Sequence, residues 1–224
     1  MKVEENNPII YKDGTQKWYK NDLLHRDDDK PAVIYNNGEQ QWYQNGELHR
    51  DNDRPAIIYY DGTREWYQNG KLHRNNDQPA MICSVLQESV PTPYGEGDSV
   101  CVNEIKKWYQ NGQLHRDNDQ PAATGSDGSQ FWYKNGKLHR DNDQPAIIWG
   151  NGGQIWYKNG KKHRSNNDQP ALIDNDVLKM EWYQNGKLHR DNNLPASIFG
   201  KKIKWYKNGI KQEKGEIDCN HIKG

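Results

Sequence analysis

A Trp-Tyr pair occurs eight times in this chain, and most successive copies are separated by 24 residues. A unit of this length cannot bury a core of its own, so each copy must pack against its neighbours in a repeat array. Function in such arrays usually depends on an extended surface. The recurring tryptophans are Trp18, Trp42, Trp66, Trp108, Trp132, Trp156, Trp182 and Trp205.

The composition restricts the classes of partner. A mean hydropathy of −1.27 is typical of disordered chains, but here the apolar residues occupy fixed positions in each repeat, and Trp and Tyr bury large areas. The 31 basic and 31 acidic residues are interspersed. Nucleic acids and acidic membrane surfaces require a basic face, so we expect neither partner. We expect no cofactor.

The cysteine usage and the first residues predict a cytoplasmic protein. Three cysteines are too few for a disulfide framework and indicate a reducing compartment. The polar start of the chain lacks the apolar stretch of a signal peptide, so we expect a protein that is not secreted. Cys83 and Cys101 flank the same insertion, and a local bridge between them stays open.

Each repeat carries two turn signals, which predict strands and leave no room for a helix. Asn-Gly or Asp-Gly pairs such as Asn37-Gly38 and Asn45-Gly46 favour two-residue type I′ hairpins. The predicted fold class is therefore all-β, an elongated antiparallel β-hairpin repeat array (a meander or solenoid) with about 24 residues per repeat. Eight prolines open the units: Pro8, Pro31, Pro55, Pro79, Pro121, Pro145, Pro170 and Pro195.

Counting from two such turns gives an expected register. Tyr43 would face Leu48 and Trp42 would face His49, while Val33 would face Trp42 and Tyr35 would face Gln40. Side chains alternate across a sheet, so Val33, Tyr35, Trp42 and His49 would share one face. Ala32, Ile34, Tyr43 and Leu48 would share the other face.

The polar segment that joins successive repeats, His-Arg-Asp-Asn-Asp, is expected to bend the chain, because Asp and Asn bond nearby backbone amides. Its arginine could form a bidentate pair with a carboxylate of the neighbouring repeat. The histidines beside Trp are expected to be structural. They are His25, His49, His73, His115, His139, His163 and His189.

Two irregular regions interrupt the pattern. Residues 81–104 contain an insertion in the fourth unit, which is expected to extend a hairpin and to mark a weak division within the array. Residues 206–224 are expected to form a C-terminal cap or tail. One continuous array of eight units is the preferred organisation. The insertion also supplies candidate binding residues, namely Tyr94, Glu96 and Asp98.

The motifs that suggest catalysis or metal binding have simpler interpretations. Five copies of His-Arg-Asp resemble a kinase catalytic loop but lack the other kinase motifs. Equivalent histidines would lie roughly 9 to 10 Å apart, too far to share one zinc ion. The Asp-Asn-Asp segment lacks the glycine and glutamate of a calcium loop. We therefore expect no enzyme and no metal site.

The aromatic ladder is either a core or a binding platform. Burial of Trp between repeats is the favoured interpretation, whereas Tyr on the opposite face is the better candidate for stacking on sugars or quaternary ammonium groups. The candidate binding tyrosines in the ladder are Tyr43, Tyr67, Tyr133 and Tyr157.

The run G-x-x-x-W-Y-x-N-G-K-L-H at residues 62–73 and 128–139 resembles the MORN (membrane occupation and recognition nexus) repeat. The likeness covers nearly all of the chain outside residues 81–104. The Arg after His and the added Asp-Asn-Asp-x-Pro segment depart from that pattern and are similar to divergent MORN-like proteins of giant DNA viruses. The resemblance implies a scaffold or dimerisation module and a viral source, located in the host cytoplasm or the virion. A weaker likeness is to choline- and glucan-binding repeats.

These observations predict a non-enzymatic scaffold or protein-protein interaction repeat protein. A protein partner is expected, and a homodimer through edge strands or array ends is an open alternative. Deleting residues 86–100 should leave the fold intact but weaken partner binding. The alternative function is a ligand-binding module that recognises glycans or choline-like groups through Trp and Tyr rows.

Overall fold

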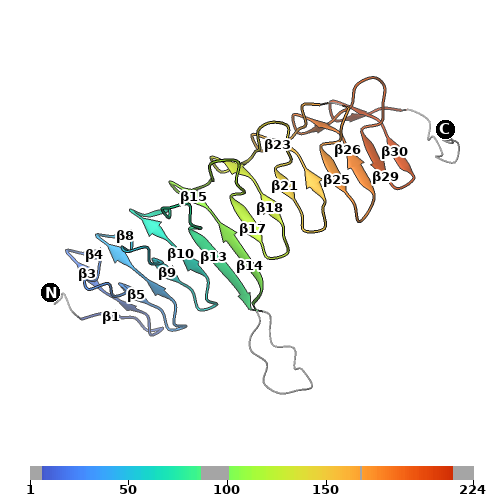
Figure 1. The fold of residues 1–224 in the computed structure, drawn as a ribbon. Coiled ribbons are helices and arrows are strands. Elements are labelled where there is room, and N and C mark those ends of the chain that lie inside the picture. Colours follow the sequence, from blue (N-terminus) through green and yellow to red (C-terminus); the bar gives the residue numbers. More distant parts are fainter. Residues whose placement is uncertain (1–6, 87–100, 167, 214–224) are drawn as a thin grey trace, which may run out of the picture. The chain divides into compact units, whose positions relative to one another are not determined.

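The structure is a computed structural model that describes residues 7–86, 101–166 and 168–213 (Figure 1). All regular elements in these ranges are β-strands joined antiparallel in a meander of hairpins, which confirms the predicted all-β hairpin repeat array. The chain divides into two compact units, Met1–Leu114 and His115–Gly224.

In both units the large sheet is built from two strands per repeat, placed next to each other in chain order. The first unit contributes β1 (Ile9–Ile10), β2 (Gln16–Lys17), β5 (Val33–Ile34), β6 (Gln40–Gln41), β9 (Ile57–Ile58), β10 (Arg64–Glu65), β13 (Met81–Leu86) and β14 (Cys101–Lys107). The second unit contributes β17 (Ala123–Gly125), β18 (Gln130–Phe131), β21 (Ile147–Ile148), β22 (Gln154–Ile155), β25 (Leu172–Asp174), β26 (Lys179–Glu181), β29 (Ser197–Phe199) and β30 (Lys202–Lys204).

Each repeat also forms a separate two-stranded hairpin after its tryptophan. In the first unit these hairpins are β3 (Tyr19–Lys20) with β4 (Leu23–Leu24), β7 (Tyr43–Gln44) with β8 (Glu47–Leu48), β11 (Tyr67–Gln68) with β12 (Lys71–Leu72), and β15 (Tyr109–Gln110) with β16 (Gln113–Leu114). In the second unit they are β19 (Tyr133–Lys134) with β20 (Lys137–Leu138), β23 (Tyr157–Lys158) with β24 (Lys161–Lys162), β27 (Tyr183–Gln184) with β28 (Lys187–Leu188), and β31 (Tyr206–Lys207) with β32 (Ile210–Lys211). Figure 1 shows β3, β4 and β8 next to one another beside the large sheet of the first unit.

The small hairpins confirm the predicted type I′ turns. Asn45 and Gly46 both have positive φ, 49° and 84°, and Tyr43 pairs with Leu48 as expected. The Gly46 amide also donates to the Leu24 carbonyl of the preceding repeat at 2.9 Å. The turn that closes one hairpin therefore joins it to its neighbour.

The turns of the large sheet differ from the prediction. At Gly38 only the glycine has positive φ, and its amide donates to the Tyr35 carbonyl, so the loop has three residues and ends in a glycine bulge. The Asn37 side chain accepts the Glu39 amide at 3.0 Å, which fixes this turn. Val33 consequently pairs with Gln41 rather than Trp42.

This shift of one residue in the register changes which side chains share a face of the large sheet. The expected pairs of Val33 with Trp42 and of Tyr35 with Gln40 are wrong, because Ile34 pairs with Gln40 and Tyr35 bonds Glu39. Side-chain alternation therefore places Val33 and Tyr35 on the face of Gln41, and the bond from Tyr43 to Gln41 joins Tyr43 to the same face. The expected grouping of Val33 with Trp42 is corrected accordingly.

The core consists of the recurring tryptophans together with the alanine that follows most of the repeat-opening prolines. The eight tryptophans are 4% to 9% exposed, and Ala32 and Ala56 are fully buried. The Trp42 amide donates to the Ala56 carbonyl of the next repeat at 2.8 Å. Burial of Trp between repeats, the favoured interpretation of the ladder, is therefore confirmed.

The insertion lengthens one hairpin, as expected. Strands β13 and β14 pair over six positions, with Cys83 opposite Ile105 and Cys101 opposite Leu86. Cys83 is a free thiol. The candidate residues Tyr94, Glu96 and Asp98 lie outside the described residues. Of the predicted cap, residues 206–213 are described and include the last small hairpin.

Candidate functional site

The arginine of the segment between repeats contacts the tryptophan of its own repeat, and Arg50, Arg74 and Arg140 also bond an aspartate of the preceding repeat. The Arg50 guanidinium lies 3.7 Å from the centre of the Trp42 ring. Its Nε and Nη2 donate to the two carboxylate oxygens of Asp29 at 2.8 and 2.9 Å, which confirms the expected bidentate pair. These bonds hold the pKa of Asp29 below its ordinary value. The Trp42 indole donates to the Asp29 carbonyl at 3.0 Å.

The histidines bond within their own repeat through Nε2 and reach the next repeat through Nδ1. His49 Nε2 donates to Asp51 at 3.1 Å, and Nδ1 accepts the backbone amide of Asn69 in the next repeat at 3.2 Å. The acceptor role of Nδ1 requires an unprotonated nitrogen. The hydrogen bond from Gln44 and that from His49 lower the pKa of Asp51. The same bond to the next repeat is made by His25, His115, His139, His163 and His189, whereas Nδ1 of His73 has no hydrogen-bond partner among the described residues.

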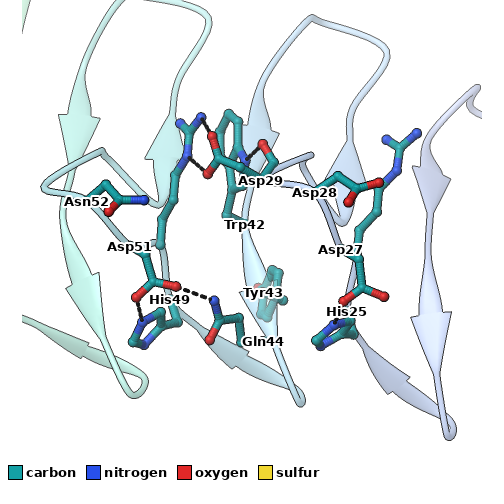
Figure 2. Close-up of a pocket in the computed structure, with 12 residues that line it drawn as sticks. His25, Asp27, Asp28, Asp29, Trp42, Tyr43, Gln44, His49, Asp51 and Asn52 are labelled. Atoms are coloured by element: carbon teal, nitrogen blue, oxygen red, sulfur yellow. Dashed lines mark hydrogen bonds and ion pairs between the residues drawn. The ribbon is translucent and has the colours of Figure 1, made fainter.

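A polar cavity of about 310 Å³ lies between two successive segments of this kind, at residues 25–29 and 49–52 (Figure 2). Figure 2 shows His25 and Asp27 at one side and His49 and Asp51 at the other, with Trp42 and Tyr43 between them. A similar cavity of about 220 Å³ occurs in the second unit at residues 115–119 and 139–142. The polar groups that line these cavities bond mainly to one another, which gives them a structural role.

The first unit also carries two rows of tyrosine, which we name the tyrosine face. It consists of Tyr11, Tyr19, Tyr35, Tyr43, Tyr59 and Tyr67. Within a repeat the two phenols approach each other across the sheet: the hydroxyls of Tyr11 and Tyr19 are 3.3 Å apart. That contact raises the pKa of Tyr19 to about 12.

The third repeat has a buried carboxylate below its tyrosine pair. Both Tyr59 and Tyr67 donate their hydroxyls to Glu65 Oε2, at 3.3 and 3.0 Å. Glu65 is 7% exposed. Burial and the Glu65 charge raise the pKa of both tyrosines, so both phenols stay neutral at physiological pH. In the second repeat the corresponding acceptor is the neutral Gln41, which Tyr43 contacts at 3.0 Å.

The predicted binding tyrosines of the ladder are divided between the two units. Tyr43 and Tyr67 belong to the tyrosine face, and Tyr133 and Tyr157 occupy equivalent half-buried positions in the second unit. The recurring tryptophans are buried and cannot stack on a ligand. The first row of the tyrosine face (Tyr11, Tyr35 and Tyr59) and Glu65 were not among the predicted binding residues. The three-residue first turn is the signal that would have placed them beside the second row.

The tyrosine face is less regular in the second unit. At the position of Tyr35 that unit has Gly125, Trp149, Asp174 and Phe199. Trp149 is 42% exposed and packs edge-on against Phe131, with ring centres 5.2 Å apart. The paired tyrosines are therefore a feature of the first unit.

No group of three His, Cys, Asp or Glu side chains in the described residues could hold a metal ion. Nor does this part of the chain contain a helix of the length and apolarity that a bilayer span requires.

Comparison with protein-family models and with curated proteins finds no match to this chain.

Proposed function

We propose that this chain is a non-enzymatic scaffold protein that binds a protein partner through the tyrosine face. The observation that carries the proposal is the pairing of phenols across one face in three successive repeats, while the Trp, Arg and His side chains bond between repeats. Tyrosine is enriched at protein interfaces because its ring adds apolar area and its hydroxyl bonds polar groups. The MORN-like sequence pattern, whose repeats are implied to act as scaffolds, agrees with this function.

A capture experiment tests the proposal. Immobilised protein is incubated with cell extract, and the bound proteins are compared between the natural chain and a Tyr35→Ser/Tyr59→Ser variant. The matched control is Arg64→Ser, because Arg64 alternates with Glu65 on β10 and lies on the other side of the sheet. Loss of the same proteins in the tyrosine variant alone supports the proposal. Equal capture by all three proteins contradicts it.

The second candidate function is recognition of glycans or choline-like groups by the same tyrosines. It is favoured by the ring of Tyr11, which is 42% exposed, since aromatic faces stack on sugars and attract quaternary ammonium groups. Titration of the protein with oligosaccharides and with choline, followed by intrinsic fluorescence, tests it. A saturable change that Tyr11→Ser removes would support this function, and a flat titration would contradict it.

A further inference from the structure

The tyrosine pairs recur with the spacing of the repeats. Each repeat adds two strands to the sheet, and neighbouring strands are about 4.8 Å apart, so successive pairs lie roughly 9.6 Å apart. The pairs Tyr11/Tyr19, Tyr35/Tyr43 and Tyr59/Tyr67 therefore offer aromatic contacts at a constant period along the first unit. A linear partner that contacts each pair in the same way must have a matching period.

Of the regular polypeptide conformations, polyproline II has that period. Its three residues per turn advance about 9.3 Å, which differs from the tyrosine spacing by only about 0.3 Å per repeat. A β-strand places side chains on one side every 6.7 Å or so, and one turn of an α-helix advances about 5.4 Å. Polyproline II segments also bind preferentially to aromatic-lined surfaces.

The Glu65 carboxylate gives this surface a charge preference. It is buried below Tyr59 and Tyr67, and its carboxylate accepts hydrogen bonds from these two neutral phenols. The equivalent Glu181 of the second unit is also buried but pairs with Lys179 at 3.0 Å. The position of Lys179 is occupied by Thr63 in the third repeat, so Glu65 lacks that counter-ion.

The neighbouring charges of this face add to the negative potential. Glu39 and Asp61 both contribute to the raised pKa of Tyr59. Two lysines lie at the ends of the surface: Lys17 stacks on Tyr11, with Nζ 4.8 Å from the ring centre, and Lys107 is separated from Glu65 by Met81 in the strand register. The centre of the tyrosine face is therefore acidic and aromatic, which favours a cation.

We propose that the tyrosine face binds a basic, proline-rich segment in the polyproline II conformation, with an Arg or Lys side chain over Tyr59, Glu65 and Tyr67. This inference rests on the proposed function and specifies its partner. Prolines contact the tyrosine rings once per repeat, and the basic side chain supplies the positive charge that Lys179 provides for Glu181.

Fluorescence anisotropy with synthetic peptides tests the proposal on the full chain. The probe is a labelled peptide of four Pro-Pro-Arg triplets. A peptide of Gly-Ser-Arg triplets has the same charge without the polyproline II preference, and a peptide of Pro-Pro-Glu triplets has the conformation with the opposite charge. We expect the Pro-Pro-Arg peptide to bind about tenfold more tightly than either control. Equal binding of the two arginine peptides would overturn the polyproline II conformation.

Three variants test the position of the basic side chain. Glu65→Gln keeps an acceptor for both phenols but removes the charge, and Thr63→Lys supplies the counter-ion that Lys179 gives Glu181. Each should weaken Pro-Pro-Arg binding about tenfold. The control Glu181→Gln should leave it unchanged, because Glu181 already has its lysine. Circular dichroism and the thermal midpoint show whether the variants keep the fold.

The outcomes separate this inference from the proposed function. Unchanged affinity in both Glu65→Gln and Thr63→Lys overturns the placement of the cation. Failure of the Pro-Pro-Arg peptide to bind, combined with tyrosine-dependent capture of proteins from extract, overturns the inference and leaves the proposed function standing. Loss of tyrosine-dependent capture as well contradicts both.

Discussion

Arg50 holds Asp29 of the preceding repeat with two hydrogen bonds, at 2.8 and 2.9 Å. The same guanidinium covers Trp42 of its own repeat and donates from Nη1 to the Pro55 carbonyl of the next repeat at 3.2 Å. One side chain thus connects three consecutive repeats. Because repeat arrays are stabilised largely by interfaces between neighbours, such bonds should dominate the stability of the chain.

Replacing Arg50 by lysine should destabilise the fold, because lysine cannot form the planar bidentate pair with Asp29 or stack in the same way on Trp42. We expect Arg50→Lys to lower the free energy of unfolding by about 1–2 kcal/mol. Urea denaturation followed by tryptophan fluorescence measures the change. The control is Arg64→Lys on an exposed site of β10, where the change should be close to zero; equal effects would contradict the role of Arg50.

The indole hydrogen bond can be isolated by comparing two tryptophans. Trp42 donates to the Asp29 carbonyl, whereas the buried Trp18 indole has no hydrogen-bond partner among the described residues. Both rings are stacked by an arginine at 3.7 Å, so that contribution cancels. Trp42→Phe should therefore cost about 1 kcal/mol more than Trp18→Phe in denaturant unfolding. Equal losses would show that the indole bond adds no stability.

Local chemistry made much of this fold predictable. The small hairpin follows from Asn45-Gly46, because that pair tolerates positive φ at both positions. The bend between repeats also follows from its residues: Asn52 and Asp53 have positive φ, and the Arg54 amide donates to the Asp51 carbonyl at 3.3 Å. In both places neighbouring residues alone decide the conformation.

The tyrosine face could not be predicted, because it depends on whether the turn at Asn37-Gly38 has two residues or three. At Asn37 the side chain accepts a backbone amide and keeps its own φ negative, which lengthens the loop by one residue. The additional loop residue makes Val33 pair with Gln41 instead of Trp42, and it brings Tyr35 to the same face of the sheet as Tyr43. The Glu65 site is harder still to predict, because its prediction requires both the register of β10 and the burial of the Glu65 side chain.

The stability of the second unit should depend on pH through His163. Burial, and secondarily Lys158, lowers the pKa of His163 below its ordinary value of 6.5. Its Nδ1 accepts the Asn185 amide at 3.2 Å, which requires the neutral ring. As the pH falls below about 6.5, the unfolded chain takes up a proton before the folded chain does. The free energy of unfolding should therefore decrease until the lowered pKa is reached, and above 6.5 it should not depend on this group.

The control for His163 is built into the other repeats. Five of them place an aspartate two residues after the histidine, as in His139 with Asp141 at 2.8 Å, whereas the corresponding residue here is Ser165. Ser165→Asp should raise the pKa of His163 and reduce the loss of stability in acid. NMR titration of the imidazole measures the pKa, and denaturation between about pH 8 and pH 5.5 measures the stability. A His163 pKa at or above 6.5 in the natural chain would refute this assignment.

The two glycine turns should differ in their tolerance of alanine. Gly38 and Gly46 have nearly the same φ, 87° and 84°, so alanine is strained at both by about 1 kcal/mol. A Cβ at Gly38 meets no atom within 4 Å, whereas at Gly46 it would lie 3.3 Å from Leu23 of the preceding repeat. The Gly46 amide also bonds Leu24, so a shift there loosens two hairpins. Gly46→Ala should therefore lower the thermal midpoint more than Gly38→Ala, and the reverse order would show that the small hairpins add little to the interface between repeats.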